Sequence, residues 1–460
     1  MTNVAAAGIR VATRSRTAPG PRPHPLFGNL PAFRRDPLGF LRDAARDHGD
    51  VVRLWVGRRP AHLFRHPEHI QEILQTRQHN YPKRQQALDR MSLVLGQGLV
   101  TSSGELWRRQ RRTIQPAFHQ LRLAALGATM ERVIADLVRQ WRTPADRGAA
   151  IDVHREMMGL AFRVVGEALF GTDLSAVTQA VREALAVIER QTSDRLYRLA
   201  RWPLWMPTAL NREFRGAVAA LDRTVSDIVA ERRAAARRPP DLLTGLLDAR
   251  DEAGRPMHDR QLRDEILTLL LAGHENTGNA LTWMWYLLAM HPEVERRVHT
   301  ELRAVLGDRS PTAADLPALP YCGMVVAETL RLYPTSWLLL REAAEDDEIG
   351  GFHIRRGSVV LISPFVTHRH PGCWPAPDTF DPDRFAAAPA AERHRCAYLP
   401  FGAGARKCIG STFAVQEAQL VLAAVASRYR LADPPVPPPT PRPVVSLPPD
   451  RGLALTIHSR

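Results

Sequence analysis

The chain has 460 residues, of which 45% are hydrophobic and 24% charged, and it carries a formal net charge of +14. This balance is typical of a globular protein that buries a large core, and it excludes intrinsic disorder, collagen and a small disulfide scaffold. Lys83 and Lys407 are the only lysines among 62 basic residues, so the excess of charge is arginine. A GC-rich genome explains that excess most simply, and a basic surface for an acidic partner is the alternative.

The N-terminal part of the chain predicts a tail followed by a small sheet. Residues 1–17 indicate a flexible tail, and the proline-rich residues 18–25 indicate a stiff approach to the folded body. Residues 51–56 and 62–64 are short β-strand candidates. The turn-forming residues 57–60, Gly-Arg-Arg-Pro, separate the two candidates.

The middle of the chain is predominantly helical. From residue 104 to about residue 236, apolar residues recur every three or four positions, and the segment 202–207 interrupts this pattern. Helix is predicted again up to Leu306. Residues 266–290 form the longest apolar segment, which four polar residues interrupt: His274, Glu275, Asn276 and Asn279. A buried helix therefore fits this segment better than a membrane span, and we expect no membrane anchor.

The C-terminal part adds short strands around a last helix. Residues 359–363 and 453–457 are strand candidates, and a helical pattern begins at Ser411. No internal repeat or long linker divides the chain, so we predict one mainly α-helical domain with small β-sheets over residues 18–460. The four cysteines form no C-x-x-C pair, which favours a reduced, cytoplasmic protein. The arginines are dispersed, so we expect no nucleic-acid partner.

The segment FGAGARKCIG, residues 401–410, carries the strongest chemical signal. Its glycines permit a tight backbone around Cys408, directly before the helical pattern. A sulfur at a helix N-terminus that Arg406 and Lys407 flank lies in positive potential, which favours the thiolate that a soft metal prefers. For an isolated cysteine, a buried structural role would be the commoner interpretation.

This segment resembles the haem-binding loop of the cytochrome P450 monooxygenases, F-G-x-G-x-R-x-C-x-G, at every defining position. The resemblance implies the triangular-prism fold of that family, with haem between the helix after the cysteine and a long helix that faces bound oxygen. It implies haem b as cofactor, Cys408 as the axial thiolate ligand of the iron, Arg406 on a propionate, and Phe401 and Gly410 beside the haem. A thiolate ligand helps to cleave the O–O bond of O2, the co-substrate.

Two further motifs lie in the order that the family shows. Glu328 and Arg331 reproduce its E-x-x-R, which alone would be an ordinary ion pair on a helix. Arg384 lies in a sequence that matches P-x-R-F. The resemblance implies that these three charges form a buried structural network ahead of the cysteine loop.

The family's W-x-x-x-R pattern is matched by Trp107 and Arg111. Four residues apart, the two side chains share one face of a helix, so both can reach one carboxylate. The resemblance places both on the haem propionates, together with Arg341. The neighbouring Arg108, Arg109 and Arg112 would face outward, where they are candidates for docking an acidic electron donor.

Residues 272–277, AGHENT, resemble the oxygen-facing segment of the family, A-G-x-[D/E]-T-[T/S]. The resemblance implies that the small residues Ala272 and Gly273 leave room above the haem, and that Glu275, Asn276 and Thr277 are the catalytic residues. Asn276 departs from the pattern, because the family carries an alcohol there and Thr277 does not restore it. A carboxamide accepts and donates hydrogen bonds but does not readily relay a proton.

This departure leaves three hypotheses for proton delivery. Either waters linked to Glu275 deliver the protons, or a hydroxyl group of the substrate assists, or the reaction is an oxidative coupling or desaturation. The oxygen-facing segment alone does not decide among them.

The resemblance implies a haem-thiolate monooxygenase that hydroxylates or epoxidises a hydrophobic small molecule, such as a terpenoid or a polyketide. Trp205 and Trp337 fall in regions that line the pocket in the family, which favours a bulky apolar pocket. Few residues follow the cysteine loop, so we expect no fused reductase. Electrons would come from NAD(P)H through ferredoxin reductase and ferredoxin, and we expect a monomer.

Two alternatives stand beside this reading. The same fold supports oxidative coupling, desaturation or peroxide-driven catalysis, and Asn276 keeps that alternative open. A haem-binding sensor without turnover is an alternative of another class. Turnover with ferredoxin and its reductase would separate an enzyme from a sensor.

Overall fold

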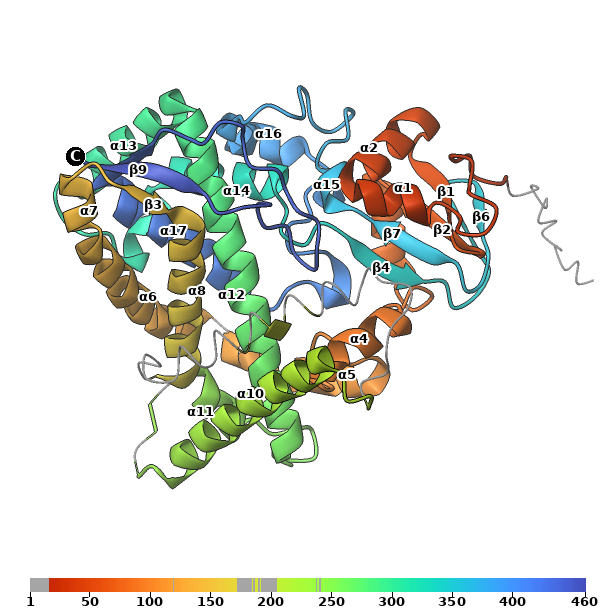
Figure 1. Ribbon diagram of the computed structural model, residues 1–460, viewed down its shortest axis with the longest axis horizontal. Helices are drawn as coiled ribbons and strands as arrows, with labels where there is room; N and C mark the ends of the chain where they lie inside the picture. Colours follow the sequence, from red (N-terminus) through yellow and green to blue (C-terminus); the bar gives the residue numbers. More distant parts are fainter. Residues whose placement is uncertain are drawn as a thin grey trace, which may run out of the picture.

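The computed structural model describes residues 16–118, 120–171, 205–236, 238–239 and 241–460, together with residues 184, 187, 188 and 191. Of the expected tail, residues 1–15 lie outside the described residues, as do residues 202–204 of the expected helix break. The strands of the largest sheet gather at one end of the molecule, and most of the long helices gather at the other end (Figure 1).

The helices and strands have the following bounds. The α-helices are α1 Leu30–Arg35, α2 Pro37–His48, α3 Pro67–Gln71, α4 Gln85–Leu95, α5 Gly104–Ile114, α6 Gln120–Gln140, α7 Arg142–Asp146, α8 Val153–Phe170, α10 Ala209–Ala234, α11 Leu242–Asp248, α12 Asp259–Met290, α13 Pro292–Leu306, α14 Pro320–Leu332, α15 Pro364–Thr367, α16 Ala387–Glu392 and α17 Ser411–Ala426. Short helical turns are η1 Glu72–Thr76, η2 Gln115–Phe118, η3 Ala313–Ala318, η4 Pro382–Phe385, η5 Arg395–Ala397 and η6 Gly404–Arg406. The strands are β1 Val51–Val56, β2 Arg59–Phe64, β3 Ala150–Asp152, β4 Leu339–Glu342, β5 Asp347–Ile349, β6 Phe352–Ile354, β7 Val359–Ile362, β8 Tyr429–Ala432 and β9 Ala454–Ser459.

The largest sheet has four strands in the order β1-β2-β7-β4. Strands β2 and β7 are parallel, while β1 and β4 run antiparallel to their neighbours. β1 has the predicted bounds, but β2 begins at Arg59, three residues before the predicted start. Pro60 pairs with Trp55 of β1 and lies beyond the residues that pair with β7, so its missing N–H interrupts no bond of that second ladder.

Helix α12 runs through the middle of the helical part (Figure 1) and packs against α8. Two glycines allow the close approach. A Cβ atom on Gly278 would lie 2.5 Å from Met158 Sδ, and one on Gly273 would lie 3.0 Å from Val165 Cγ2. The missing side chain of Gly273 therefore serves the contact with α8, whereas the neighbouring Ala272 is exposed to open space.

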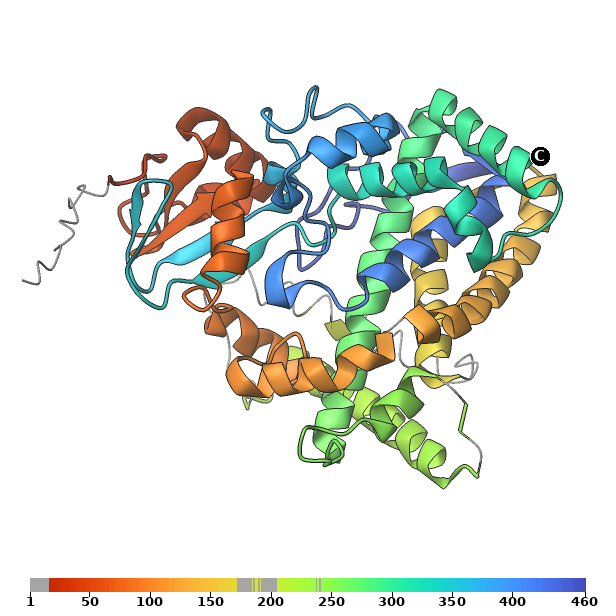
Figure 2. The ribbon, with the colours of Figure 1, turned by 180° about the vertical axis from the view of Figure 1, so that it is seen from behind.

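Helices α14 and α17 also pack against α12, and they lie side by side when the molecule is seen from behind (Figure 2). α12 covers the apolar segment 266–290 and confirms that it forms a largely buried helix. Within the described part of the chain, no helix is long and apolar enough to cross a membrane. The last strand, β9, begins one residue after the predicted start and pairs with both β3 and β8.

Candidate cofactor site

The cysteine loop, residues 401–410, is folded back on itself directly before α17. The Cys408 N–H donates to the Phe401 carbonyl at 3.0 Å, and the Lys407 N–H donates to the Gly404 carbonyl at 3.0 Å. Gly404 has a φ of +71°, and a Cβ atom there would lie 1.9 Å from the Leu74 carbonyl oxygen. Only glycine fits this position, so the pattern of glycines follows from the close approach of the neighbouring chain.

Opposing effects act on the Cys408 sulfur. Burial raises the pKa of the thiol, while the Gly410 N–H, Arg111 and Lys407 favour the thiolate and only partly offset it. The expectation that Arg406 contributes is not met, because its guanidinium turns to the Ser102 carbonyl. Cys408 is nevertheless an exposed residue, so the sulfur faces an open space within the protein. A bound metal cation would deprotonate such a thiol outright.

Buried basic side chains gather on the approach to this loop. The Arg406 guanidinium lies 4.0 Å above the Trp107 ring and donates to the Ser102 carbonyl at 2.9 Å. Burial, with Arg341 and Arg111 nearby, lowers the pKa of Arg406 to about 10. Arg341 is itself 8% exposed, and burial lowers its pKa to about 10.

Lys83 completes this basic cluster, which we define as Lys83, Arg111, Arg341 and Arg406. Its Nζ donates to the Val100 carbonyl at 2.8 Å, and burial lowers its pKa to about 7, with further effects from Arg406 and Arg341. Lys83 lies in none of the motifs, so the sequence did not predict it at this site. Its rarity was the only signal, since the chain has one other lysine.

The basic cluster fits a bound anion. None of its four members forms an ion pair with a carboxylate among the described residues. Each donates to a backbone carbonyl instead, as Arg111 does to that of Lys407 at 3.0 Å. Bringing four cations together, one buried and three partly buried, without counter-charges is unfavourable, and a ligand with two carboxylates would relieve it. Haem carries two propionates and an iron ion. The basic cluster fits the propionates, and the open Cys408 sulfur fits the iron.

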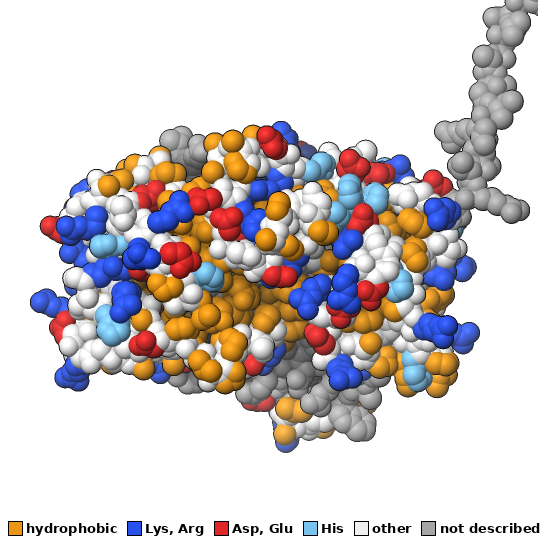
Figure 3. Space-filling view, turned by 90° about the horizontal axis from the view of Figure 1, so that it is seen from above, with side chains coloured by type: hydrophobic (Ala, Val, Ile, Leu, Met, Phe, Trp, Pro, Cys, Tyr) orange, Lys and Arg blue, Asp and Glu red, His pale blue; other side chains and the backbone are white. Residues whose placement is uncertain are grey.

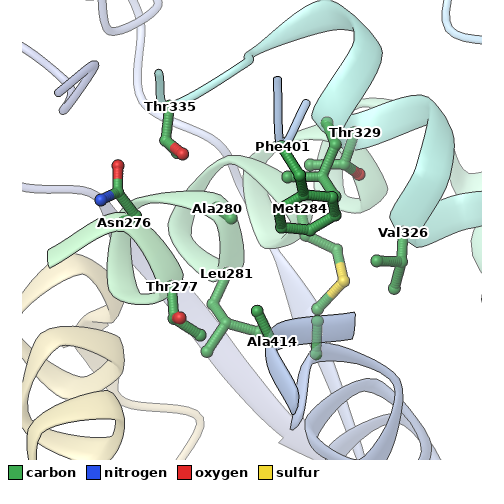
Figure 4. Close-up of a pocket in the computed structure, with 12 residues that line it drawn as sticks. Asn276, Thr277, Ala280, Leu281, Met284, Val326, Thr329, Thr335, Phe401 and Ala414 are labelled. Atoms are coloured by element: carbon green, nitrogen blue, oxygen red, sulfur yellow. The ribbon is translucent and has the colours of Figure 1, made fainter. Parts of the chain in front are cut away.

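An apolar cavity lies between α12, α14 and α17 (Figure 4). Phe401 reaches it from the cysteine loop, while Asn276 and Thr335 lie together at another end of the cavity (Figure 4). The Thr277 hydroxyl donates to the Gly273 carbonyl at 2.7 Å and is held by its own helix.

Asn276 presents one free polar atom at this cavity. Its Nδ2 donates to the Ala272 carbonyl at 3.1 Å, while no described group donates to its Oδ1. The position that carries an alcohol in the family pattern therefore offers a hydrogen-bond acceptor here. Glu275, the adjacent acid, instead accepts a hydrogen bond from the Ser446 hydroxyl of the C-terminal loop.

The structure brings Glu328, Arg331 and Arg384 together in a buried network. Arg331 Nε lies 2.6 Å from Glu328 Oε2 and its Nη2 lies 2.8 Å from Oε1, with both side chains fully buried. Arg384 Nε lies 3.5 Å from Glu328 Oε1. The second guanidinium also donates to the Pro375 and Ala376 carbonyls, so the carboxylate joins α14 to the chain that leads to the cysteine loop.

A second cluster with metal-binding donors is formed by Asp50, His66 and His370, whose ligand atoms lie within 4.8 Å of one another. Both imidazoles accept a backbone N–H through Nδ1, from Glu68 at 3.4 Å and from Gly372 at 3.1 Å. Neutral rings bonded in this way carry their proton on Nε2, and Asp50 already pairs with Arg65 at 2.7 Å. The arrangement is a hydrogen-bonded cluster rather than a metal centre.

An open thiol sulfur, an unpaired basic cluster and an apolar cavity between long helices define the site of a haem-thiolate protein. Residues 18–455 match the family described as Cytochrome P450. The chain belongs to the cytochrome P450 family, which confirms the predicted family and its mainly helical fold with small sheets.

Similar proteins come from streptomycetes. The chain is 41% identical over 443 residues to cyclooctatin synthase of Streptomyces melanosporofaciens, with 94% of each chain covered. It is 38% identical to cyclooctat-9-en-7-ol 5-monooxygenase of the same organism, over 90% of this chain and 89% of the other. The crystal structure of the haem domain of cytochrome P450DA has a TM-score of 0.87 and 28% identity, over 97% of this chain and 99% of that chain.

We predict that Glu328→Gln strongly destabilises the protein. The substitution leaves the buried Arg331 guanidinium without its counter-charge, which costs about 3–5 kcal/mol of the free energy of unfolding. Urea denaturation and the haem content of the purified protein measure the effect. Glu105→Gln is the matched control, because Glu105 pairs with Arg108 at the same i,i+3 spacing but is exposed. Equal stability of the two variants would contradict the prediction.

We predict that Lys83 makes the stability of the haem-depleted protein depend on pH. The folded-state pKa of about 7 lies below the ordinary value of 10.5, so between these values the unfolded chain binds more protons. The free energy of unfolding therefore rises as the pH increases from 7 toward 10, and the full penalty applies below pH 7. Lys83→Met should remove this slope and be the more stable protein at pH 6.

Urea denaturation at pH 6 and pH 9 measures this dependence. The control is Lys407→Met, which removes the other, exposed lysine and should keep the wild-type slope. A slope that persists in Lys83→Met would assign the dependence to other groups.

Proposed function

We propose that this cytochrome P450 is a monooxygenase that hydroxylates or epoxidises a hydrophobic terpenoid with O2, and that haem b is its cofactor. The observation that carries the proposal is the open Cys408 sulfur beside the unpaired basic cluster, next to an apolar cavity lined by α12. The relatives whose names describe oxygenation or synthesis of cyclic natural products support the substrate class. Pentalenene oxygenase of Streptomyces avermitilis, 33% identical over 90% of this chain and 91% of the other, belongs with them.

A hydrophobic substrate suits the surroundings of the cavity. Seen from above, hydrophobic side chains gather in a hollow near the middle of the face, with charged groups around it (Figure 3). Of the two tryptophans expected to line the pocket, Trp205 is 74% exposed. Trp337 is buried, and its ring stacks on Phe33 at a centroid distance of 6.3 Å. We therefore assign Trp337 to packing rather than to substrate contact.

The residues of this chain divide the work as follows. Thiolate-ligated haem iron supplies the activation of O2 when it is bound. Cys408 would hold the metal, and the propionates would be held by Trp107 and by the basic cluster of Lys83, Arg111, Arg341 and Arg406. The cavity wall would exclude water from the apolar substrate. Asn276 Oδ1 accepts a hydrogen bond from water or from a substrate hydroxyl. That bound hydroxyl takes the place of the alcohol side chain that the family pattern carries at this position.

We further propose that electrons come from NAD(P)H through a ferredoxin reductase and a ferredoxin. Arg109 and Lys407 are exposed, and they lie close in sequence to Arg111 and Cys408. These two cationic side chains would dock an acidic donor near the cofactor site. Arg108 and Arg112 pair with Glu105 and Glu252, so a donor would have to exchange with these acids. A single haem domain over residues 18–460, a monomer and a cytoplasmic location complete the proposal.

We predict that the reduced, haem-loaded protein with carbon monoxide shows the far red-shifted Soret band of thiolate ligation. Cys408→Ser should abolish that band, while Cys373→Ser, which removes another thiol outside the site, should keep it. A band in the ordinary position for the wild type would overturn the proposal.

Terpenoid hydrocarbons and alcohols are then screened for a change of spin state and for products with ferredoxin and its reductase. Turnover with peroxide alone would favour the peroxide-driven alternative, and binding without turnover a sensor.

We predict that Asn276→Thr lowers the ratio of product formed to NAD(P)H consumed, by about tenfold. Two threonines of α12, Thr277 and Thr282, donate their hydroxyls to the carbonyl four residues back, at 2.7 Å each. The introduced hydroxyl would likewise bond to the Ala272 carbonyl, so its oxygen would be held against the helix backbone and the acceptor would be withdrawn from the cavity. Thr277→Ser keeps its helical bond and is the control. An unchanged ratio would show that Asn276 has no special role.

A further inference from the structure

The C-terminal loop, residues 443–450, is bonded to one face of α12 at three successive turns. The Ser446 hydroxyl donates to Glu275 Oε1, and Asn279 Nδ2 donates to Ser446 Oγ at 3.1 Å. One turn further along, Trp283 Nε1 donates to the Leu447 carbonyl at 2.8 Å. Because residues 275, 279 and 283 are spaced by four, they lie on one face of the helix, and the loop follows that face.

All of these contacts except the Glu275 carboxylate, which is partly exposed, are closed to solvent. Ser446 and Asn279 are each 1% exposed, and Trp283 and Leu447 are fully buried. Water cannot replace a hydrogen bond of these four residues, so the loss of a partner leaves a buried polar group unsatisfied. The Ser446 hydroxyl is the central element, because it donates to a carboxylate and accepts from an amide at the same time.

The same loop is bonded to the segment that follows α14. Trp337 Nε1 donates to the Val444 carbonyl at 2.9 Å, and the Tyr333 ring stacks on Trp283 with 4.0 Å between centroids and 5° between planes. Thr335 lies between these two aromatic residues in the sequence. The loop therefore joins α12 to the segment that carries Thr335.

These two elements carry two polar residues of the cavity, Asn276 and Thr335. Asn276 directly follows Glu275 on α12, and Asn276 and Thr335 lie at the same end of the cavity (Figure 4). A movement of the loop would therefore change the spacing of Asn276 and Thr335. The hydroxyls of Thr277 and Thr329, which also line the cavity, donate to their own helices, so the spacing of Asn276 and Thr335 decides where a polar group of a substrate is held.

We propose that Ser446 is a positioning residue for substrate selection: its hydroxyl holds Glu275 and Asn279 against the C-terminal loop and so sets the spacing of Asn276 and Thr335. This inference rests on the proposed function. Ser446 is not among the described residues that line the cavity, and it acts through the two elements that it joins. An alanine at this position loses both hydrogen bonds at once.

The first measurement is hydrogen–deuterium exchange of residues 443–450 in the haem-loaded protein. Ser446→Ala should exchange about tenfold faster there than the wild type, as expected for the loss of about one net hydrogen bond. Ser446→Thr keeps the hydroxyl and should restore slow exchange. Ser459→Ala is the control, because that hydroxyl bonds to Asp146 at an exposed position, 3.2 Å away. Wild-type exchange in Ser446→Ala would overturn the inference.

The second measurement uses a terpenoid that the wild type converts. Ser446→Ala should change the ratio of regioisomeric products and raise the dissociation constant of the substrate, measured spectroscopically, about tenfold. Ser446→Thr should restore both to the wild-type values. Faster exchange with an unchanged product ratio and affinity would overturn the role in substrate selection. If Ser446→Ala does not retain haem, Ser446→Cys, with a weaker donor, gives the same comparison at smaller amplitude. Absence of the red-shifted Soret band in the wild type would refute the proposed function, while the exchange measurement would still test the contact of the loop.

Discussion

The bidentate pair between Arg331 and Glu328 determines where the cysteine loop lies. Arg331 also donates to the His368 carbonyl at 2.9 Å, and the His368 ring accepts the Leu399 N–H through Nε2 at 2.7 Å. Burial lowers the pKa of His368 to about 3, so this ring stays neutral and keeps its acceptor. A chain of buried hydrogen bonds thus runs from α14 to Leu399, two residues before the cysteine loop begins, and the position of the sulfur depends on it.

Charged groups at the cofactor site lower the stability of this fold. Lys83, Arg341 and Arg406 are buried near one another without acidic partners among the described residues, which disfavours the folded state. Burial likewise disfavours the Cys408 thiolate. A metal and two carboxylates at the site would relieve both penalties, and binding of the cofactor would then be coupled to folding. The large positive charge of the chain is a separate matter, since most of its arginines lie elsewhere.

Helix α12 carries three different functions on its different faces. Gly273 and Gly278 allow α8 to approach, Asn276 and Ala280 line the cavity, and residues 275, 279 and 283 hold the C-terminal loop. A displacement of this helix for any one of these contacts changes the other two, because packed interiors transmit small shifts. This coupling explains how a residue outside the cavity, such as Ser446, can influence the substrate that the cavity holds.

The sequence alone determined the family, the cysteine loop, the strand β1 and the residues of the charge network, because each depends on residues that are close in the chain or match a short pattern. It predicted Gly273 beside the haem, and the structure adds a second reason for this glycine, the close approach of Val165 of α8. Only the tertiary structure revealed Lys83 in the basic cluster and the bond between Glu275 and Ser446, which lie 171 residues apart. Such contacts join separate elements, so no spacing within one helix or strand encodes them, and packing alone decides them.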